Sequence, residues 1–309
     1  MPPSDPSKSV SRGRRSICGA GGTKGQAGSA HNPFRFMPPS GSGLPTLDEI
    51  GRDLLEVSAW RRALSLALPF ALAAAFFVFA HHGLWAPALA CPVALSFLTY
   101  ASISHDLVHR SLRLPPALNE VLLAAIELLA FRSGHAYRAV HLHHHAAFPA
   151  ESDLEGAAAH MTWWRALLEG PALQPRLWLF ALRERTPARD RSWAIGEGAL
   201  VLLSLALCAG LFAAGISVLP VVYAALMIAG SWIYPFMTSY IPHDASGVSD
   251  LTQTRLFRGH VTSWLAFEHL YHLEHHLYPG VPHHRWPQLA RRLNPHFSRL
   301  GLRPIVVIF

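Results

Sequence analysis

Two long stretches without charged residues constrain this chain more than any other feature of its sequence. Residues 63–104 contain no Asp, Glu, Lys or Arg, and neither do residues 198–241. As helix, each stretch would be about 60 Å long, enough to cross a hydrocarbon layer of about 30 Å twice. Breaks near His81–Gly83 and between Gly215 and Pro220 divide the two stretches. The sequence therefore predicts two transmembrane hairpins, with spans at about 63–80, 84–104, 198–215 and 219–241.

The positive charges indicate which way these hairpins face. The chain has 26 Lys and Arg against 19 Asp and Glu, a net charge of +7. The two short hairpin turns, near 81–86 and 215–219, contain no Lys or Arg. Because cytosolic loops are enriched in Lys and Arg, we expect both termini on the cytosolic side of a multi-pass membrane protein. The basic residues flank the apolar stretches, so anionic lipid headgroups are their expected partner, and no nucleic acid is expected.

The segments before the first hairpin have a different character. Residues 1–45 are rich in Pro, Gly, Ser and Arg, a composition typical of a disordered tail. Thr46 precedes Glu49 by three residues, which is the spacing of a helix capping box. An interfacial amphipathic helix is therefore predicted over 46–62. The remainder, 63–309, is assigned to one membrane domain.

Histidines gather in three short motifs beside the apolar stretches. Box one is HDLVH at 105–109, box two is HLHHH at 141–145, and box three is HLEHH at 272–276. Residues three and four apart share one face of a helix. Helical phase therefore places eight imidazoles on shared faces: His105, His109, His141, His144, His145, His272, His275 and His276. His143 faces the other way and is not expected to bind a metal.

So many converging imidazoles are typical of a metal centre. Closely packed imidazoles cannot all carry protons, and neutral imidazole is the commonest metal ligand. With 20 histidines in 309 residues, chance would give the pattern HxxHH about 0.1 times, yet it occurs twice. Four crossings return all three boxes to the cytosolic side. We therefore expect an all-α membrane protein with four transmembrane helices in two hairpins and a cytosolic helical cap that carries the boxes.

The number and type of ligands indicate which metal is bound. Zinc takes four ligands, so eight imidazoles suit two ions better than one. A zinc peptidase would need an HExxH motif with its catalytic carboxylate, and the sequence has none. Haem held by paired histidines would need them in the interior of the spans. Redox-active iron with open positions for dioxygen fits this set of nitrogen ligands best.

The order and spacing of the boxes resemble the membrane fatty acid desaturase superfamily, which includes acyl desaturases and carotenoid hydroxylases and ketolases. The resemblance covers roughly residues 60–295. Its most specific pieces are HDLVH, HAYRAVHLHHH from His135 to His145, and YHLEHHLYPGVPHHRWPQL from Tyr271 to Leu289. It implies a non-haem centre of two iron ions that uses dioxygen as co-substrate to remove hydrogen from an unactivated C–H bond of a lipid.

The resemblance also implies a ninth ligand. Its members carry a further histidine after the fourth span and before box three, and His243, in IPHDASG, matches that place. The alternative is a helix-end histidine paired with Asp244. Asp106 is expected to orient a neighbouring imidazole. His260 and His269 are expected to support the ligands and not to bind metal.

Three functions stay open at this point. The leading hypothesis is desaturation of a fatty acyl lipid chain in the bilayer. Hydroxylation or ketolation of a carotenoid such as β-carotene is compatible with the same boxes. A metal-handling membrane protein, such as a transporter, is the alternative from another class, and it would place ligands inside the spans. Since the sequence carries no dinucleotide fingerprint and no fused haem donor motif, we expect an external ferredoxin or other reductase to supply electrons.

Overall fold

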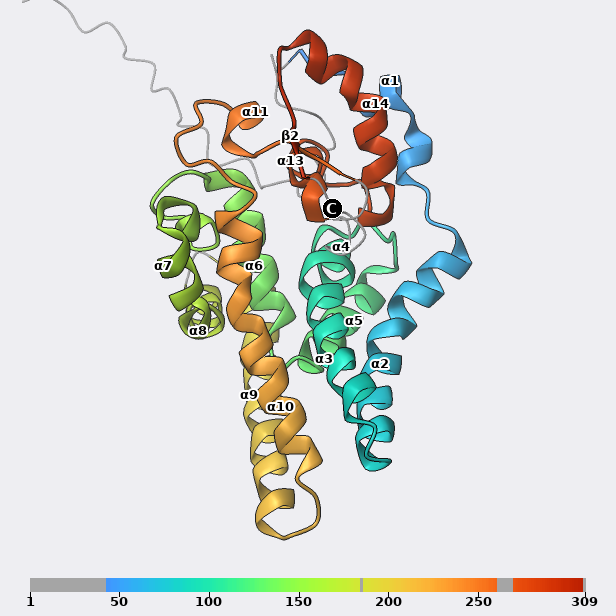
Figure 1. Cartoon of the computed structure of the whole chain (residues 1–309), viewed down its shortest axis with the longest axis vertical. Helices are drawn as coiled ribbons and strands as arrows, with labels where there is room; N and C mark the ends of the chain where they lie inside the picture. The colour runs from blue at the N-terminus through green and yellow to red at the C-terminus, as the bar shows by residue number, and fades with distance from the viewer. Residues whose placement is uncertain (1–42, 184–185, 260–268, 308–309) are drawn as a thin grey trace, which may run out of the picture. The chain divides into compact units, whose positions relative to one another are not determined.

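The computed structural model describes residues 43–183, 186–259 and 269–307 (Figure 1). All of them belong to one compact unit, residues 33–309. About 72% of this part of the chain is helical, and its strands are the two-residue pair β1 (Phe257–Arg258) and β2 (Ile305–Val306). The all-α prediction is confirmed. The tail predicted over 1–45 lies outside the described residues, apart from its last three.

The first hairpin consists of α2 (Ala59–His81) and α3 (Trp85–Leu98). The Ser58 side chain caps α2 by accepting a hydrogen bond from the Arg61 N–H, and Gly83 makes the turn with a φ of 72°. The second helix does not stop at Leu98. It continues through the π-helical turn η2 (Thr99–Ile103) into α4 (Ser104–His109), so that box one is the last turn of the second span.

The second hairpin consists of α9 (Ala188–Ala213) and α10 (Leu219–Gly230), and α10 continues through η4 (Ser231–Ile233) and η5 (Pro235–Tyr240). Large apolar side chains of α9 are exposed, including Leu202 at 66% and Leu207 at 60%. Such a continuous apolar surface suits lipid and not water.

Four helices of the described chain are long and apolar enough to cross a membrane, as predicted. They span Arg52–His81, Trp85–His109, Ala188–Ala213 and Leu219–Tyr240. The third begins before the predicted 198. Its first turns carry Asp190 and Glu197, which bind Arg138 and the N-terminus of α6 (Gly134–Ala147). Both hairpin turns lie at the same end of the unit, away from α4, α6 and α13 (His272–Leu277) (Figure 1).

Shorter helices connect the two hairpins. Box two lies on α6 (Gly134–Ala147), and α5 (Pro116–Leu128) precedes it. The Ser133 hydroxyl caps α6 by accepting from the Ala136 N–H at 3.1 Å. The segments η3 (Gly156–His160), α7 (Trp163–Leu168) and α8 (Gly170–Ala181) follow. Helix α6 packs against α8 and α9, and also contacts α4, which brings boxes one and two together.

The segments that carry box three come last. They are α11 (Asp250–Gln253), η6 (His269–Tyr271), α13 (His272–Leu277), η7 (His283–Arg285) and α14 (Trp286–Arg299). Their core includes Leu277, Trp286 and Leu293, and Leu54 from the beginning of the described chain packs into the same core.

The single helix predicted over 46–62 requires a correction. The capping box is present, since the Thr46 hydroxyl and N–H both contact the Glu49 carboxylate. The helix ends after one turn, however, because Gly51 adopts a φ of 111°, which only glycine adopts without strain. The segment therefore divides into α1 (Leu47–Ile50), η1 (Arg52–Leu55) and the beginning of α2. Its apolar face packs against α14.

Candidate metal centre

The nine histidines predicted as ligands lie in two groups. The five-histidine group consists of His105, His109, His141, His145 and His275, and the four-histidine group consists of His144, His243, His272 and His276. Within each group, one nitrogen of every member lies within 4.8 Å of the corresponding atom of the others. Three helices, α4, α6 and α13, carry eight of these residues, and His243 lies three residues after the end of η5.

The division between the groups follows spacing along the helices. Histidines separated by four residues stay together, as do His141 and His145 in the five-histidine group, and His272 and His276 in the four-histidine group. The histidine at the fourth position of each HxxHH motif joins the opposite group: His144 belongs to the four-histidine group, and His275 belongs to the five-histidine group. Boxes two and three therefore each contribute to both groups.

In the five-histidine group the Nε2 atoms converge. The His141 Nε2 lies 3.0 Å from that of His109 and 3.1 Å from that of His145. The His275 Nε2 lies 2.8 Å from that of His145 and 3.1 Å from that of His105. Nitrogens bound to one ion at about 2.0–2.1 Å are separated by about 2.8–3.4 Å when their bond angles are between about 90° and 109°. The observed separations match this geometry.

The Nε2 atoms of the four-histidine group converge in the same way. That of His243 lies 3.0 Å from His144, 3.2 Å from His272 and 3.2 Å from His276. The His276 Nε2 completes the group at 3.1 Å from His272 and 3.3 Å from His144. Each group is therefore compatible with a single ion at its centre.

Hydrogen bonds at the opposite ring nitrogens determine what these Nε2 atoms offer. The His243 Nδ1–H donates to the Ser239 carbonyl oxygen at 3.0 Å, and the His144 Nδ1–H donates to the Asp153 carboxylate at 2.6 Å. A neutral imidazole that donates from Nδ1 presents a lone pair at Nε2. Two such lone pairs facing each other at 3.0 Å repel unless a cation lies between them. The donor set therefore fits a metal ion, and Asp153 and Ser239 orient the rings as carboxylates and carbonyls do in metal sites.

Burial keeps most of these imidazoles neutral. Together with the neighbouring imidazoles, it lowers the pKa well below the ordinary value for His141, His145, His275 and His276. Burial also opposes protonation of His144, but the bond to Asp153 outweighs it and raises the pKa. The Glu155 carboxylate accepts from the His141 Nδ1–H at 2.9 Å, and burial raises its pKa to about 7.

Two residues close to the ligands in sequence lie outside both groups. His143, predicted not to bind, packs its ring 5.2 Å from that of Phe180. The Asp244 carboxylate binds the hydroxyl and N–H of Ser246, and the His243 ring nitrogens instead face the Ser239 carbonyl oxygen and the His144 Nε2, which favours the ligand assignment over the pairing with Asp244. His260 and the side chain of His269 lie outside the described residues.

Asp106 orients an imidazole, as expected, but not that of a predicted ligand. Its carboxylate accepts from the His283 Nδ1–H at 2.6 Å and from the His283 backbone N–H at 3.0 Å, and also from the Ser111 hydroxyl at 2.8 Å. These contacts join box one to the segment after box three. His284 lies in the same cluster, yet both Asp106 oxygens already accept hydrogen bonds, so the cluster is a structural clamp.

A buried network of ion pairs connects α6 with α5 and α9. The His135 ring bridges Glu120 of α5 at 3.0 Å and Glu197 of α9 at 2.7 Å. Arg138 donates to Glu120 at 2.6 Å, and the His135 ring stacks on Trp193. Burial disfavours the charged form of His135, but the two carboxylates outweigh it and raise its pKa. The network fixes the helix that carries box two.

Sequence reasoning missed the partners of the ligands. Asp153 and Glu155 follow box two in a loop that the helical pattern does not describe, and Ser239 acts through its backbone carbonyl. A usable signal existed, because the run ESDLE places acidic residues at alternating positions shortly after the box. His283 stood in the quoted segment after box three, but nothing in its spacing pointed to Asp106.

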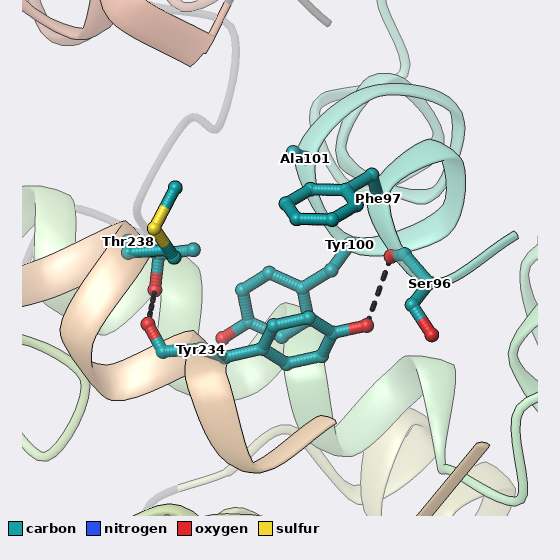
Figure 2. Close-up of a pocket in the computed structure, with 7 residues that line it drawn as sticks. Ser96, Phe97, Tyr100, Ala101, Tyr234 and Thr238 are labelled. Atoms are coloured by element: carbon teal, nitrogen blue, oxygen red, sulfur yellow. Dashed lines mark hydrogen bonds between the residues drawn. The ribbon is translucent and has the colours of Figure 1, made fainter. Parts of the chain in front are cut away.

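An apolar pocket lies between the two hairpins, close along the chain to the histidine groups. Its lining comes from the ends of the second and fourth spans: Ser96, Phe97, Tyr100, Ala101, Tyr234, Met237 and Thr238. Figure 2 shows that the hydroxyls of Tyr234 and Thr238 are turned to backbone oxygens, those of Ser96 and Tyr234 respectively, at 2.8 Å each. With these polar groups satisfied by the protein, the lining is apolar, and the cavity it encloses is small, about 10 Å³.

A comparison with known protein families agrees with this arrangement. The family model for fatty acid desaturases matches residues 83–306, a range that includes all nine histidines. The chain therefore belongs to the fatty acid desaturase family, and the resemblance inferred from the boxes is confirmed. No curated protein matches the chain. The family and the four apolar helices together indicate an oxidoreductase of the membrane.

Proposed function

We propose that this protein is a membrane-bound di-iron oxidoreductase that desaturates a fatty acyl lipid chain with dioxygen and external electrons. The observation that carries the proposal is the convergence of nine buried or partly buried imidazoles into two groups with Nε2 separations of 2.8–3.3 Å. Family membership supports the choice of iron. Nitrogen-rich sites with open positions suit iron that reacts with dioxygen.

The residues of the chain have distinct roles in this proposal. The five-histidine group would hold one iron and the four-histidine group the other. Glu155, Asp153 and the Ser239 carbonyl accept hydrogen bonds from the Nδ1–H groups of three ligands. The Nε2 lone pairs of these ligands, His141, His144 and His243, therefore face the candidate metal positions. When bound, the iron pair supplies the oxidising power needed to break an unactivated C–H bond. Desaturation consumes one dioxygen, two external electrons and two protons, and it yields one double bond and two waters.

The pocket between the hairpins supports a hydrocarbon substrate. Tyr100 and Tyr234 line it, five residues before His105 and nine residues before His243. The cavity of about 10 Å³ has to widen to admit an acyl chain, and a chain there would leave the hydrogen bonds of the Tyr234 and Thr238 hydroxyls intact. We further propose that the boxes face the cytosol, where a ferredoxin or other reductase supplies the electrons, because both hairpin turns lack Lys and Arg.

A product analysis tests the proposal. The protein is expressed with a redox partner in a host that makes both ordinary lipids and β-carotene, and fatty methyl esters and pigments are then profiled by mass spectrometry. New double bonds in the acyl chains are expected. Oxygenated pigment without new unsaturation would instead identify a carotenoid hydroxylase or ketolase.

Metal analysis of the purified protein separates the enzyme from a metal carrier. Two tightly bound iron ions per chain are expected, together with a product that depends on electrons and dioxygen. A protein that exchanges its metal freely and gives no product in either lipid pool would refute the proposed enzyme and support a metal-handling function.

A further inference from the structure

Three tyrosines form a stack beside the pocket and the metal ligands. The Tyr100 ring lies between those of Tyr137 and Tyr234, with centroids 4.3 Å away on both sides and interplanar angles of 24° and 29°. All three side chains are buried. Because aromatic rings pack densely in such a stack, Tyr100 has little freedom to move unless something displaces a neighbour.

The hydroxyls of these tyrosines go to different partners. That of Tyr137 donates to the Tyr100 carbonyl oxygen at 2.9 Å, and that of Tyr234 donates to the Ser96 carbonyl oxygen at 2.8 Å. Tyr100 instead donates to the Glu155 carboxylate at 3.2 Å. Among the seven pocket-lining residues, it is the one whose side chain donates to a carboxylate.

Glu155 carries this contact to the five-histidine group. The oxygen that accepts from Tyr100 lies 3.1 Å from the His141 Nδ1, and the other carboxylate oxygen lies 2.9 Å from it. On the opposite side of the ring, the His141 Nε2 is the atom that faces His109 and His145. Tyr100, Glu155 and His141 therefore form a continuous path from the wall of the pocket to a nitrogen at the candidate iron site.

We propose that Tyr100 is a positioning residue that couples occupancy of the pocket to the orientation of His141. This inference rests on the proposed function, since it takes the pocket as the substrate site and the histidines as iron ligands. The pocket, with a volume of about 10 Å³, has to widen to admit a chain, so an entering chain displaces the Tyr100 ring, whose hydroxyl holds the carboxylate that binds His141. The iron of the five-histidine group thereby responds to the presence of substrate.

The test removes the hydroxyl and keeps the ring. Tyr100→Phe retains the stack and the pocket wall, and Tyr137→Phe is the matched control because its hydroxyl reaches only a backbone carbonyl. Iron content, kcat, KM and the Mössbauer spectrum of the reduced protein are measured with and without an acyl substrate. Changing the partner of a metal-bound histidine typically costs about 10- to 100-fold in activity or metal affinity.

The expected pattern is specific. Tyr100→Phe keeps two irons per chain and lowers kcat by about 10-fold with little change in KM, the lower end of the range because Tyr100 acts on His141 through Glu155. It alters the quadrupole splitting of one iron and loses the change that substrate causes in the wild type. Tyr137→Phe resembles the wild type in all four measurements. A wild-type spectrum and substrate response in Tyr100→Phe, or equal losses in both variants, would overturn the inference.

The same samples distinguish this inference from the proposed function. If the wild-type protein holds no iron pair or produces no unsaturated acyl chain, the proposed function fails first. If the wild type holds iron and is active while Tyr100→Phe keeps its spectrum, only the coupling through Tyr100 fails. Glu155→Gln adds an independent check, because the Tyr100→Phe change should have little further effect on the spectrum in that background.

Discussion

The two histidine groups differ in how the chain builds them. The five-histidine group contains two pairs with a spacing of four residues, one from α4 and one from α6, and a single histidine from α13. The four-histidine group contains one such pair, from α13, with single histidines from α6 and from the segment after η5. A pair on one helix is fixed by helical geometry alone. The five-histidine group is thus more locally determined, and the four-histidine group depends more on tertiary packing.

The ligand number adds a second difference. An ion with six positions would have one open position in the five-histidine group and two in the four-histidine group. Loss of one ligand leaves four nitrogens in the first case and three in the second. We therefore expect the four-histidine group to hold its metal less firmly and to be more sensitive to substitution.

The largest effect is expected from removing one ligand from each group. His144→Ala and His275→Ala should both abolish turnover and reduce iron below two per chain, with the greater iron loss in His144→Ala. His143→Ala is the matched control on the same helix, and its ring packs beside Phe180 outside both groups. Iron is measured per chain by elemental mass spectrometry. Full occupancy in either ligand variant, or clear loss in the control, would contradict the assignment of the two groups.

Removing the carboxylate behind His144 should have the next largest effect. Asp153→Asn weakens the 2.6 Å hydrogen bond to the His144 Nδ1–H, and such changes cost about 10- to 100-fold in metal affinity or activity. Asp244→Asn is the control, because Asp244 is adjacent to His243 in sequence but its carboxylate binds Ser246. Iron affinity is measured by competition with a chelator. Equal affinity in the two variants would show that Asp153 does not support the four-histidine group.

A smaller effect is expected from loosening the clamp on box one. In Asp106→Asn the side chain loses its charge and one of the two oxygens that accept from His283. This should lower the free energy of unfolding by about 1–3 kcal/mol, and it should also reduce the iron content of the five-histidine group. Thermal unfolding in detergent and iron content provide the measurements. Asp48→Asn, which removes a carboxylate from an exposed ion pair with Arg52, is the control and should change less. A smaller loss of stability for Asp106→Asn than for this control would refute the clamp.

The smallest effect concerns pH and a histidine outside both groups. The pKa of His135 is raised, so its contribution to stability is fully present below the ordinary pKa of 6.5 and is lost as pH rises through the folded-state value. Glu120 behaves in the opposite way. Burial opposes its ionisation, but the hydrogen bonds with His135 and Arg138 outweigh burial and lower its pKa. Its contribution to stability is therefore fully present above the ordinary pKa of 4.5 and is lost as pH falls below that value.

Thermal stability measured between pH 3 and pH 9 tests this contrast. The wild type should lose stability on the alkaline side of the His135 transition, and His135→Gln should flatten that part of the curve. If His135→Gln has the same alkaline slope as the wild type, the protonated form of His135 does not stabilise the fold.

Much of the candidate site followed from the sequence because helical phase is a local property. The spacing of His141, His144 and His145 was enough to predict one shared face and to set His143 apart. It could not predict that His144 turns to a different group from its neighbours, because a face about 100° wide can meet two ions. Only the contacts of the α6 histidines with the histidines of α13 and with His243 separate the two groups. The segment 46–62 shows a related limit, since one left-handed glycine outweighed a favourable capping box.

The partners of the ligands were harder to foresee for a physical reason. Asp153 and Glu155 lie in a loop, where no periodicity relates a residue to the direction of its side chain. The burial of Glu197 in an apolar span was equally hidden, because only the tertiary structure places the Ser133 hydroxyl and the N-terminus of α6 beside it.

Boxes two and three each contribute histidines to both groups, so each box would bind both ions. The first iron to bind through α6 and α13 would also bring the ligands of the second into register, because the same helical turns carry both sets. We therefore expect the metals to load cooperatively, with chains holding a single iron scarce at partial saturation. By the same reasoning, a one-residue insertion within either box would displace ligands of both histidine groups.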